Sequence, residues 1–313
     1  MVSGKIRNIS YICANFFKPI RLFISWIMSE ETNTEEQSTK TNNNKPKAEM
    51  SFLDHLEALR WHFLKSILSI IACGSLAFIY SEFVWNSILL APKSPNFWTS
   101  RMLIKFSNFL GIQSNGLNSH PIQLINFNLS GQFMVDIWTA IIAGFIISFP
   151  YVVYQFWSFI KPALYENERK HASGAVAIMS GLFLIGVLFG YYLIVPFSLD
   201  WLGSYSISSE VVNQINILSY ISSVTSIVIA GGVAFELPVV VYFLSKVGLL
   251  TPKFLRKYRR HSYVILLIIA AIITPPDVLS QMIVSIPLVI LFEISIFISS
   301  GVEKARLRKM DEI

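Results

Sequence analysis

The sequence has little charge and very little cysteine. Only 14% of its 313 residues are charged, whereas a soluble domain has about 25%. The two cysteines, Cys13 and Cys73, are too few to predict a disulfide framework. The nucleotide-binding pattern G-x-x-x-x-G-K-[ST] is absent, as are the hydrolase patterns H-E-x-x-H and G-x-S-x-G. These absences argue against a disulfide-stabilised secreted domain and against three common kinds of enzyme.

Long apolar runs dominate the sequence. Hydrophobic residues make up 53% of the chain and its mean hydropathy is +0.55. A helix needs about 20 apolar residues to cross a bilayer, and the chain offers runs at 63–90, 132–160, 173–196, 218–249 and 279–300. A shorter run at 262–273 would rise only about 18 Å as a helix, so it is either a short span or half of a re-entrant hairpin. The sequence predicts an all-α polytopic membrane protein.

The lysines and arginines are distributed unevenly among the loops. Residues 1–65 hold nine of them, the 246–260 stretch holds six, and the 197–217 loop holds none. Twenty-two basic residues fall on one side of the predicted membrane and three on the other. Because basic loops stay in the cytoplasm, we expect both termini to be cytoplasmic, six crossings, and a location in the cell (inner or plasma) membrane.

The ends of the chain differ from its middle. Residues 1–49 form an N-terminal extension, with a basic segment followed by a polar, low-complexity linker. The basic segment is either an amphipathic helix on the membrane surface or a dispensable extension, with Met28 as an alternative start. We expect a membrane domain over 50–301 and a basic cytoplasmic tail over 302–313. The loop at 91–130 is long enough to fold into short helices over the outer surface.

A dense mixed-charge cluster separates two of the apolar runs. The stretch "FWSFIKPALYENERKHASG", residues 156–174, combines a proline with two glutamates, an arginine and two lysines. Pro162 ends or kinks a helix there. The cluster is either a solvated turn at the membrane surface or a binding site, and composition alone does not separate these interpretations.

Four motifs in order resemble one family. They are "HLEALR" (55–60), "FPYVVYQFWSFIKPALYENERK" (149–170), "FELPVVVYFL" (235–244) and "TPPDVLSQ" (274–281). Together they resemble the TatC family, the core membrane subunits of the twin-arginine protein translocase. The resemblance implies six helices arranged as a concave, cup-like wall, with the last two short. It also implies a receptor for signal peptides that carry paired arginines, on the cytoplasmic face.

The family resemblance also implies how the protein works and with what. It predicts single-span partners of the TatA and TatB types, a homo-oligomeric receptor complex in membrane lipid, and no role for nucleic acid. It predicts export of folded proteins driven by the proton-motive force, without nucleotide hydrolysis, cofactor or metal. The protein would then be a translocase subunit and not an enzyme.

The resemblance places the signal-peptide site at the charged cluster. Glu168 matches the family's functional glutamate, and Phe159, Pro162 and Leu164 match the motif around it. A carboxylate accepts a planar guanidinium in bidentate fashion, which suits a receptor for arginines.

A second part of the site is expected on the N-terminal helix, where the sequence departs from the family. The family pattern H-L-x-E-L-R places a glutamate where this chain has Ala58, and Glu57 stands one residue earlier. One residue turns a side chain by about 100° around a helix. Arg60 matches the pattern, so we expect Glu57 and Arg60 to contribute to peptide binding.

Polar residues inside the apolar runs form a second candidate site. Glu236 lies near the middle of the run at 218–249, and a charge at that depth usually faces a cavity or a partner. It is either a neutral group bonded to a neighbouring helix or a polar contact for TatA or TatB. Gln155 and Gln281 either extend this polar strip or pack locally. Asp277 matches an acidic residue of the family and also suits a helix N-cap.

Two other functions compete with translocation. A secondary transporter could use Glu236 as a proton carrier, but the chain shows no pair of similar halves. An intramembrane enzyme would need a catalytic pattern that the sequence lacks.

Overall fold

The computed structural model describes most of the chain after residue 51, namely residues 52–111, 116–118, 123–160, 172–206, 208, 214–274 and 278–311. The side chains of residues 52–56, 172–173, 278–279 and 307–311 lie outside the description. The chain divides into two parts, Met1–Trp61 and His62–Ile313. The described residues of the first part are the opening turns of one helix. The helical fold is therefore that of the second part, His62–Ile313.

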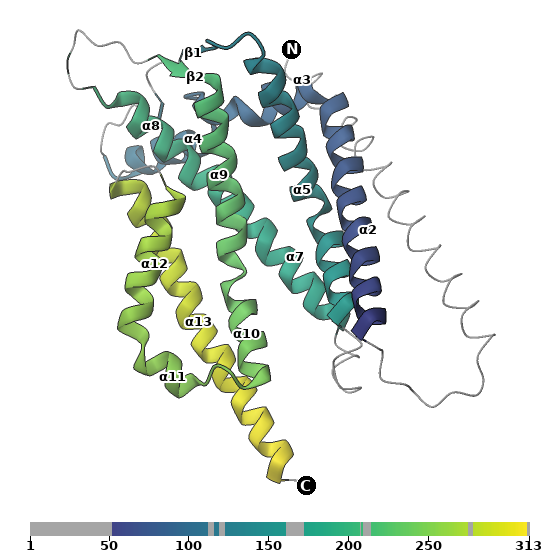
Figure 1. The fold of residues 1–313 in the computed structure, drawn as a ribbon. Helices are drawn as coiled ribbons and strands as arrows, with labels where there is room; N and C mark the ends of the chain where they lie inside the picture. Colours follow the sequence, from purple (N-terminus) through teal and green to yellow (C-terminus); the bar gives the residue numbers. More distant parts are fainter. Residues whose placement is uncertain are drawn as a thin grey trace. The chain divides into compact units, whose positions relative to one another are not determined.

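The described residues are almost entirely helical. The helices that occupy the apolar runs are α2 (Phe52–Ile79), α5 (Gly131–Ile160), α7 (Ala172–Phe189), α9 (Ile217–Phe235), α10 (Leu237–Val247), α12 (Arg259–Ile273) and α13 (Val278–Asp311). Between them lie the short helical segments α3 (Ser81–Phe83), η1 (Val84–Leu89), η2 (Ala91–Lys93), α4 (Trp98–Phe109), η4 (Gly190–Ile194), α8 (Val195–Ser204) and α11 (Pro252–Lys257). From α5 onward, successive apolar stretches run in opposite directions, and α9 and α10 follow one another in the same direction as one stretch (Figure 1).

Five helical stretches of the described chain are long and apolar enough to cross a membrane. They are Glu57–Ile79, Gly131–Ile160, Gly174–Ser204, Ile217–Val247 and Ser280–Arg306. The shorter α12 has 15 residues and packs against α13; its length corresponds to about 22 Å. The predicted all-α polytopic membrane fold is confirmed.

Three helix ends differ from the sequence-based boundaries. The first span ends at Ile79 rather than 90, and the chain continues as α3 and the π-helical η1. The third continues past 196 to Ser204 through η4 and α8, with Pro196 in the first turn of α8. The last helix runs to Asp311, so most of the predicted tail at 302–313 is helical.

Glycines allow two pairs of helices to approach closely. A Cβ added to Gly186 of α7 would lie 2.5 Å from the carbonyl oxygen of Gly231 in α9. A Cβ on Gly144 of α5 would lie 2.6 Å from the carbonyl oxygen of Ile70 in α2. Membrane helices associate through such small-residue contacts, since lipid tails supply no hydrophobic drive between them.

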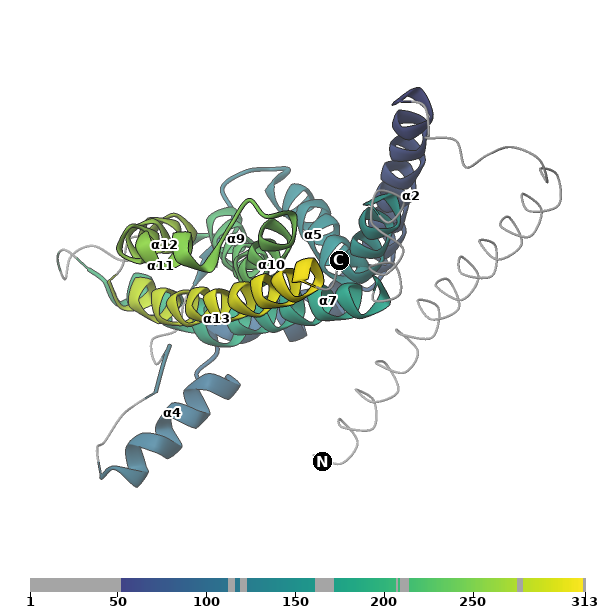
Figure 2. The ribbon, with the colours of Figure 1, turned by 90° about the horizontal axis from the view of Figure 1, so that it is seen from below.

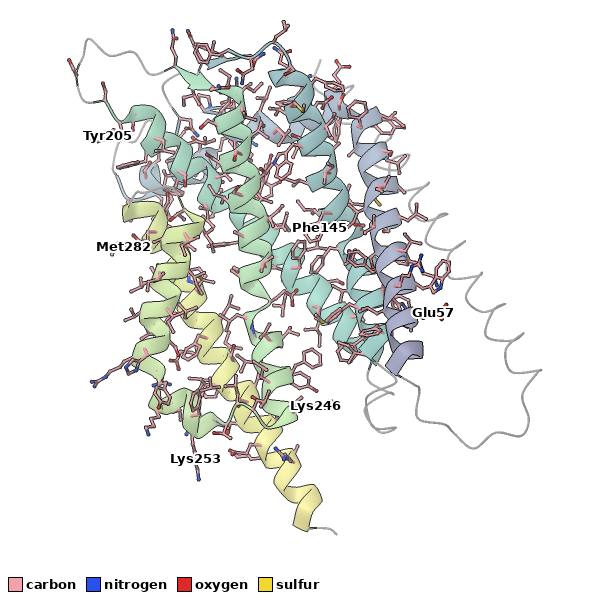
Figure 3. All side chains as sticks on the ribbon, viewed as in Figure 1. Glu57, Phe145, Tyr205, Lys246, Lys253 and Met282 are labelled. Atoms are coloured by element: carbon pink, nitrogen blue, oxygen red, sulfur yellow. The ribbon has the colours of Figure 1, made fainter. Side chains whose placement is uncertain are left out.

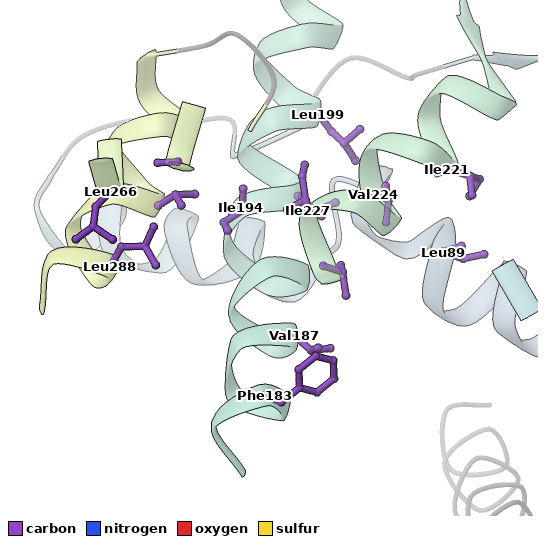
Figure 4. Packing of buried hydrophobic residues seen from close by; sticks show 14 of the residues in the cluster. Leu89, Phe183, Val187, Ile194, Leu199, Ile221, Val224, Ile227, Leu266 and Leu288 are labelled. Carbon is purple, nitrogen blue, oxygen red and sulfur yellow. The ribbon is translucent and has the colours of Figure 1, made fainter. Parts of the chain in front are cut away.

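The buried core lies between α7, α9 and α13. Phe183, Ile194 and Ile221 are 0% exposed, and Leu288 of α13 joins the same cluster (Figure 4). Many large apolar side chains instead point outward, for example Ile272 at the end of α12. An apolar exterior of this kind suits contact with lipid chains.

The two ends of the helical part differ in character. One end carries α4, α8 and the strands β1 (Leu124–Ile125) and β2 (Ile215–Asn216), which pair in parallel. There the backbone N–H of Asn118 donates to Asp200 over 2.6 Å and ties the first loop to α8. Lys246 and Lys253 lie at the opposite end from Tyr205 (Figure 3).

Candidate functional site

The predicted signal-peptide residues fall partly outside the described chain. Pro162, Leu164 and Glu168 lie outside it, as does Asp277 of the second candidate site. Their assignments stay predictions. Glu57 and Arg60 belong to the first part of the chain, where both are exposed to solvent on α2.

A buried polar network joins α2 to α5. Gln155 is 0% exposed, and its amide oxygen Oε1 lies 2.6 Å from Nδ1 of His62. Its amide nitrogen Nε2 donates to the hydroxyl of Tyr151 over 2.7 Å. A buried amide costs free energy unless it is hydrogen-bonded, and here both ends of the amide are used. The network therefore holds the two helices in one register.

Phe159 packs against this network. Its ring meets the ring of His62 edge-on, with centroids 6.3 Å apart. It stands in the last turn of α5, one residue before the helix ends at Ile160. Since Gln155 lies five residues from that end, about 7.5 Å along the axis, the network anchors the end of α5 from which the predicted site segment continues.

Glu236 lies where one predicted span breaks into two helices. It ends α9 and precedes α10, with Pro238 in the first turn of α10. Its carboxyl group lies beside the backbone of Phe183 in α7, and within the described residues neither oxygen has a hydrogen-bond partner. A buried carboxylate without a partner is costly. Among the polar groups of the described residues, the carboxyl group of Glu236 is therefore the one that a proton or a hydrogen-bonding partner would stabilise most.

Gln281, another predicted member of the intramembrane polar strip, makes a long side-chain hydrogen bond. The amide nitrogen of Gln281 in α13 lies 3.4 Å from the carbonyl oxygen of Leu267 in α12. Within the described residues, no hydrogen bond joins Gln155, Glu236 and Gln281 to one another. They occupy three separate local environments, and the assignment of Gln155 and Gln281 to an intramembrane contact strip stays a prediction.

One polar cluster was not predicted. Arg259 of α12 donates to Glu293 of α13 over 2.6 Å, and the hydroxyl of Tyr263 donates to the other oxygen of the same carboxylate. Arg259 and Tyr263 are four residues apart and so share one helix face. The four-residue spacing of Arg259 and Tyr263, together with an acidic residue inside an apolar run, could have indicated this cluster from the sequence. The cluster fastens the short α12 to α13.

The basic residues near the end of α10 are accessible. Lys253, Arg256, Lys257 and Arg260 are all exposed.

In the described part of the chain, no three His, Cys, Asp or Glu side chains gather as metal ligands would. The expectation that no cofactor is needed stays a prediction.

Comparison with known proteins gives consistent matches. A model of the family described as "Sec-independent protein translocase protein (TatC)" matches residues 54–287. The TatC protein of Blattabacterium sp. subsp. Periplaneta americana is 38% identical over 262 residues, which cover 83% of this chain and 98% of the relative. The TatC protein of Aquifex aeolicus is 33% identical over 269 residues, covering 84% and 99%.

Solved structures agree with these relatives. One described as "Crystal Structure of Twin Arginine Translocase Receptor- TatC" is 33% identical, with a TM-score of 0.61, and the match covers 80% of this chain and 99% of that one. A second, in DDM, is 32% identical with a TM-score of 0.62 and coverages of 78% and 99%. The order of motifs, the helical fold and these matches agree, and the chain belongs to the TatC family of Sec-independent protein translocase proteins.

Proposed function

We propose that this chain is the signal-peptide receptor and core membrane subunit of a twin-arginine translocase. The observation that carries the proposal is the match over 99% of a solved chain described as the translocase receptor. The chain acts with single-span TatA- and TatB-type partners, as several copies in one receptor complex. It exports folded proteins across the cell's inner or plasma membrane with the proton-motive force and without hydrolysing nucleotides.

The proposed orientation places both termini in the cytoplasm. The basic residues support it, since 22 of 25 fall on one side. The stretches α5, α7, α9–α10, α12 and α13 alternate in direction, and with α2 they support six crossings, of which α12 is the short one (Figure 1).

Glu168 is the main acceptor for the paired arginines in this proposal. Its carboxylate would take a guanidinium through charge-assisted hydrogen bonds. Pro162 and Leu164 set the conformation of the segment around Glu168. Phe159 stands in the last turn of α5, from which this segment continues. Arg60 and the auxiliary acceptor Glu57 are available on the exposed surface of α2.

Glu236 is the proposed contact for the single-span partners. Its carboxyl oxygens lack hydrogen-bond partners in the described chain, and they sit at a helix junction that a bound helix could open. Gln281 of α13 and Asp277, which lies outside the described residues, are the proposed secondary polar contacts.

Export of a folded reporter tests this function. The chain and its TatA- and TatB-type partners are produced in cells that lack their own translocase. A fluorescent protein is fused to a twin-arginine signal peptide, with a twin-lysine version as control. We expect export of the first and retention of the second. Equal export of both, or export of neither when all subunits accumulate in the membrane, would refute the proposal.

A further inference from the structure

The helix α4 has an unusual distribution of polar and apolar residues. Its buried side chains are small and polar: Thr99, Ser100 and Ser107. Four of its exposed side chains are large and apolar: Trp98 is 50% exposed, Met102 48%, Phe106 61% and Phe109 85%. A helix on the surface of a soluble protein shows the opposite arrangement. The outer face of α4 is therefore suited to an apolar medium.

The exposed residues form one continuous stripe with a basic edge. At 100° per residue, Trp98, Met102, Phe106 and Phe109 fall within about 80° of the helix circumference. Arg101 and Lys105, both exposed, fall about 60° and 20° to one side of Trp98. An apolar stripe edged by cations is the pattern of a helix that lies in the boundary of a bilayer.

The orientation of α4 fits such a boundary. In the view of Figure 2, α9, α10 and α12 are seen nearly end-on, while α4 is seen side-on and projects away from them. Figure 1 places it at the end of the helical part that also carries α8 and the paired strands. The helix thus lies across the direction of the spans, as a helix in the plane of a membrane would.

The attachment of α4 sets its depth. The hydroxyl of Thr99 donates to the carbonyl of Tyr192 in η4, and the ring of Trp98 meets the ring of Tyr192 with centroids 5.8 Å apart. Tyr192 lies 20 residues beyond Ala172, where α7 begins. Twenty helical residues rise about 30 Å, the thickness of the hydrocarbon layer. Measured along the α7–η4 axis, the contact with α4 thus lies about one hydrocarbon thickness from the start of α7.

We infer that α4 is an interfacial anchor that inserts its aromatic stripe into membrane lipid. Trp98, Met102, Phe106 and Phe109 enter the outer edge of the acyl chains, and Arg101 and Lys105 reach the headgroup phosphates. The occupant of the stripe is phospholipid, because cations at its edge match phosphate and its depth is that of the bilayer surface. The anchor holds the first loop flat on the membrane and is independent of the proposed signal-peptide site.

Fluorescence quenching in vesicles tests this inference. The full chain, with Cys13 replaced by Ser and Cys73 by Ala, carries a single cysteine from Phe106→Cys and is labelled with an environment-sensitive fluorophore. Asn108→Cys is the matched control, since Asn108 is also exposed on α4 but lies about 160° away from Phe106. If the replacement of Cys73 lowers stability, Cys73 is kept, because it is only 6% exposed. Both proteins are placed in phosphatidylcholine–phosphatidylglycerol vesicles.

The two quenchers give distinct results. With acyl chains brominated near the headgroup, the label at 106 should lose at least half of its fluorescence, and that at 108 should lose much less. Aqueous iodide should quench the label at 108 several times more strongly. Chains brominated near their ends should quench neither strongly. Iodide quenching at 106 as strong as at 108 would overturn the inference. Protection of 106 from both bromine and iodide would overturn it too, by showing that protein covers the stripe.

Discussion

The Nδ1 atom of His62 in α2 lies 2.6 Å from the amide oxygen of Gln155 in α5, although 93 residues separate them along the chain. An amide oxygen only accepts, so the imidazole donates from Nδ1. Gln155 is fully buried and also donates to Tyr151. The pair fixes the end of α5 that leads into the segment containing Glu168.

Gln155→Leu should destabilise the protein. The leucine has a similar size but removes the hydrogen-bond partner of His62 and one partner of Tyr151. Leaving a buried polar group unpaired costs about 1–3 kcal/mol, which thermal unfolding in detergent would detect. Gln281→Leu is the control, because its amide makes one contact of 3.4 Å and is partly exposed. Equal losses in the two variants would contradict a structural role for the His62–Gln155 contact.

Gly186→Ala should disturb the packing of α7 against α9. Its new Cβ would lie 2.5 Å from the carbonyl oxygen of Gly231, and overpacking of this kind costs about 1–3 kcal/mol. Gly181→Ala lies on the same helix with no atom within 4 Å of the added Cβ, so its stability should be unchanged or higher. Melting temperatures of the two variants provide the comparison. A Gly186→Ala protein as stable as Gly181→Ala would show that the close approach is not required.

Glu236→Ala should separate the two proposed binding events. Its carboxyl group lies at the α9–α10 junction, far along the span from the exposed basic end of α10. We therefore expect signal-peptide crosslinking to remain and crosslinking to TatA- and TatB-type partners to fall severalfold. Glu236→Gln, which keeps the shape, should retain part of the partner contact. Parallel loss of peptide and partner crosslinking would rule out this division of roles.

Cysteine labelling tests the orientation. A cysteine at Lys257 should be inaccessible to a membrane-impermeant reagent added to intact cells, while a cysteine at Ser206 should react. Both native residues are exposed. Lys257 ends α11 and Ser206 follows α8, and these two helices lie at opposite ends of the helical part (Figure 1). Labelling at 257 from outside would reverse the proposed topology.

The apolar runs predicted most spans because membrane helices need only length and hydrophobicity. Helix breaks were harder to predict, since apolar residues such as Phe83, Val84 and Trp85 continue past Ile79, where α2 ends. Glu236 and Pro238 marked a polar site, but the division of this span into α9 and α10 became clear only from the structure.

Contacts between distant helices could not be read from periodicity. The His62–Gln155 pair depends on the close approach of α2 to α5 at Gly74 and Gly144, which a single sequence does not reveal. The Arg259–Glu293 pair, 34 residues apart, required knowing that α12 folds back on α13. The residue types at the signal-peptide site came from motifs, and the arrangement of Pro162, Leu164 and Glu168 lies outside the described residues.

Glu168→Gln should weaken signal-peptide binding by roughly ten- to a hundredfold. The change removes the charge and keeps the shape, and a charge-assisted hydrogen bond contributes about 1.5–3 kcal/mol. Glu57→Gln should cost less, because Glu57 stands one position away from the family's glutamate. Ala58→Glu should strengthen binding by restoring that position. Peptide titration at matched protein amounts provides the ranking, and a larger effect of Glu57→Gln than of Glu168→Gln would invert it.

The most direct test of the proposed receptor function is photocrosslinking of a signal peptide that carries a reactive group beside its paired arginines. Inside-out vesicles containing the chain are irradiated with the twin-arginine peptide or its twin-lysine counterpart, and adducts are mapped by mass spectrometry. We expect adducts within residues 149–170 for the twin-arginine peptide and a strong reduction for the twin-lysine one. Equal adducts with both peptides, or adducts confined to the 91–130 loop, would contradict the proposed receptor function.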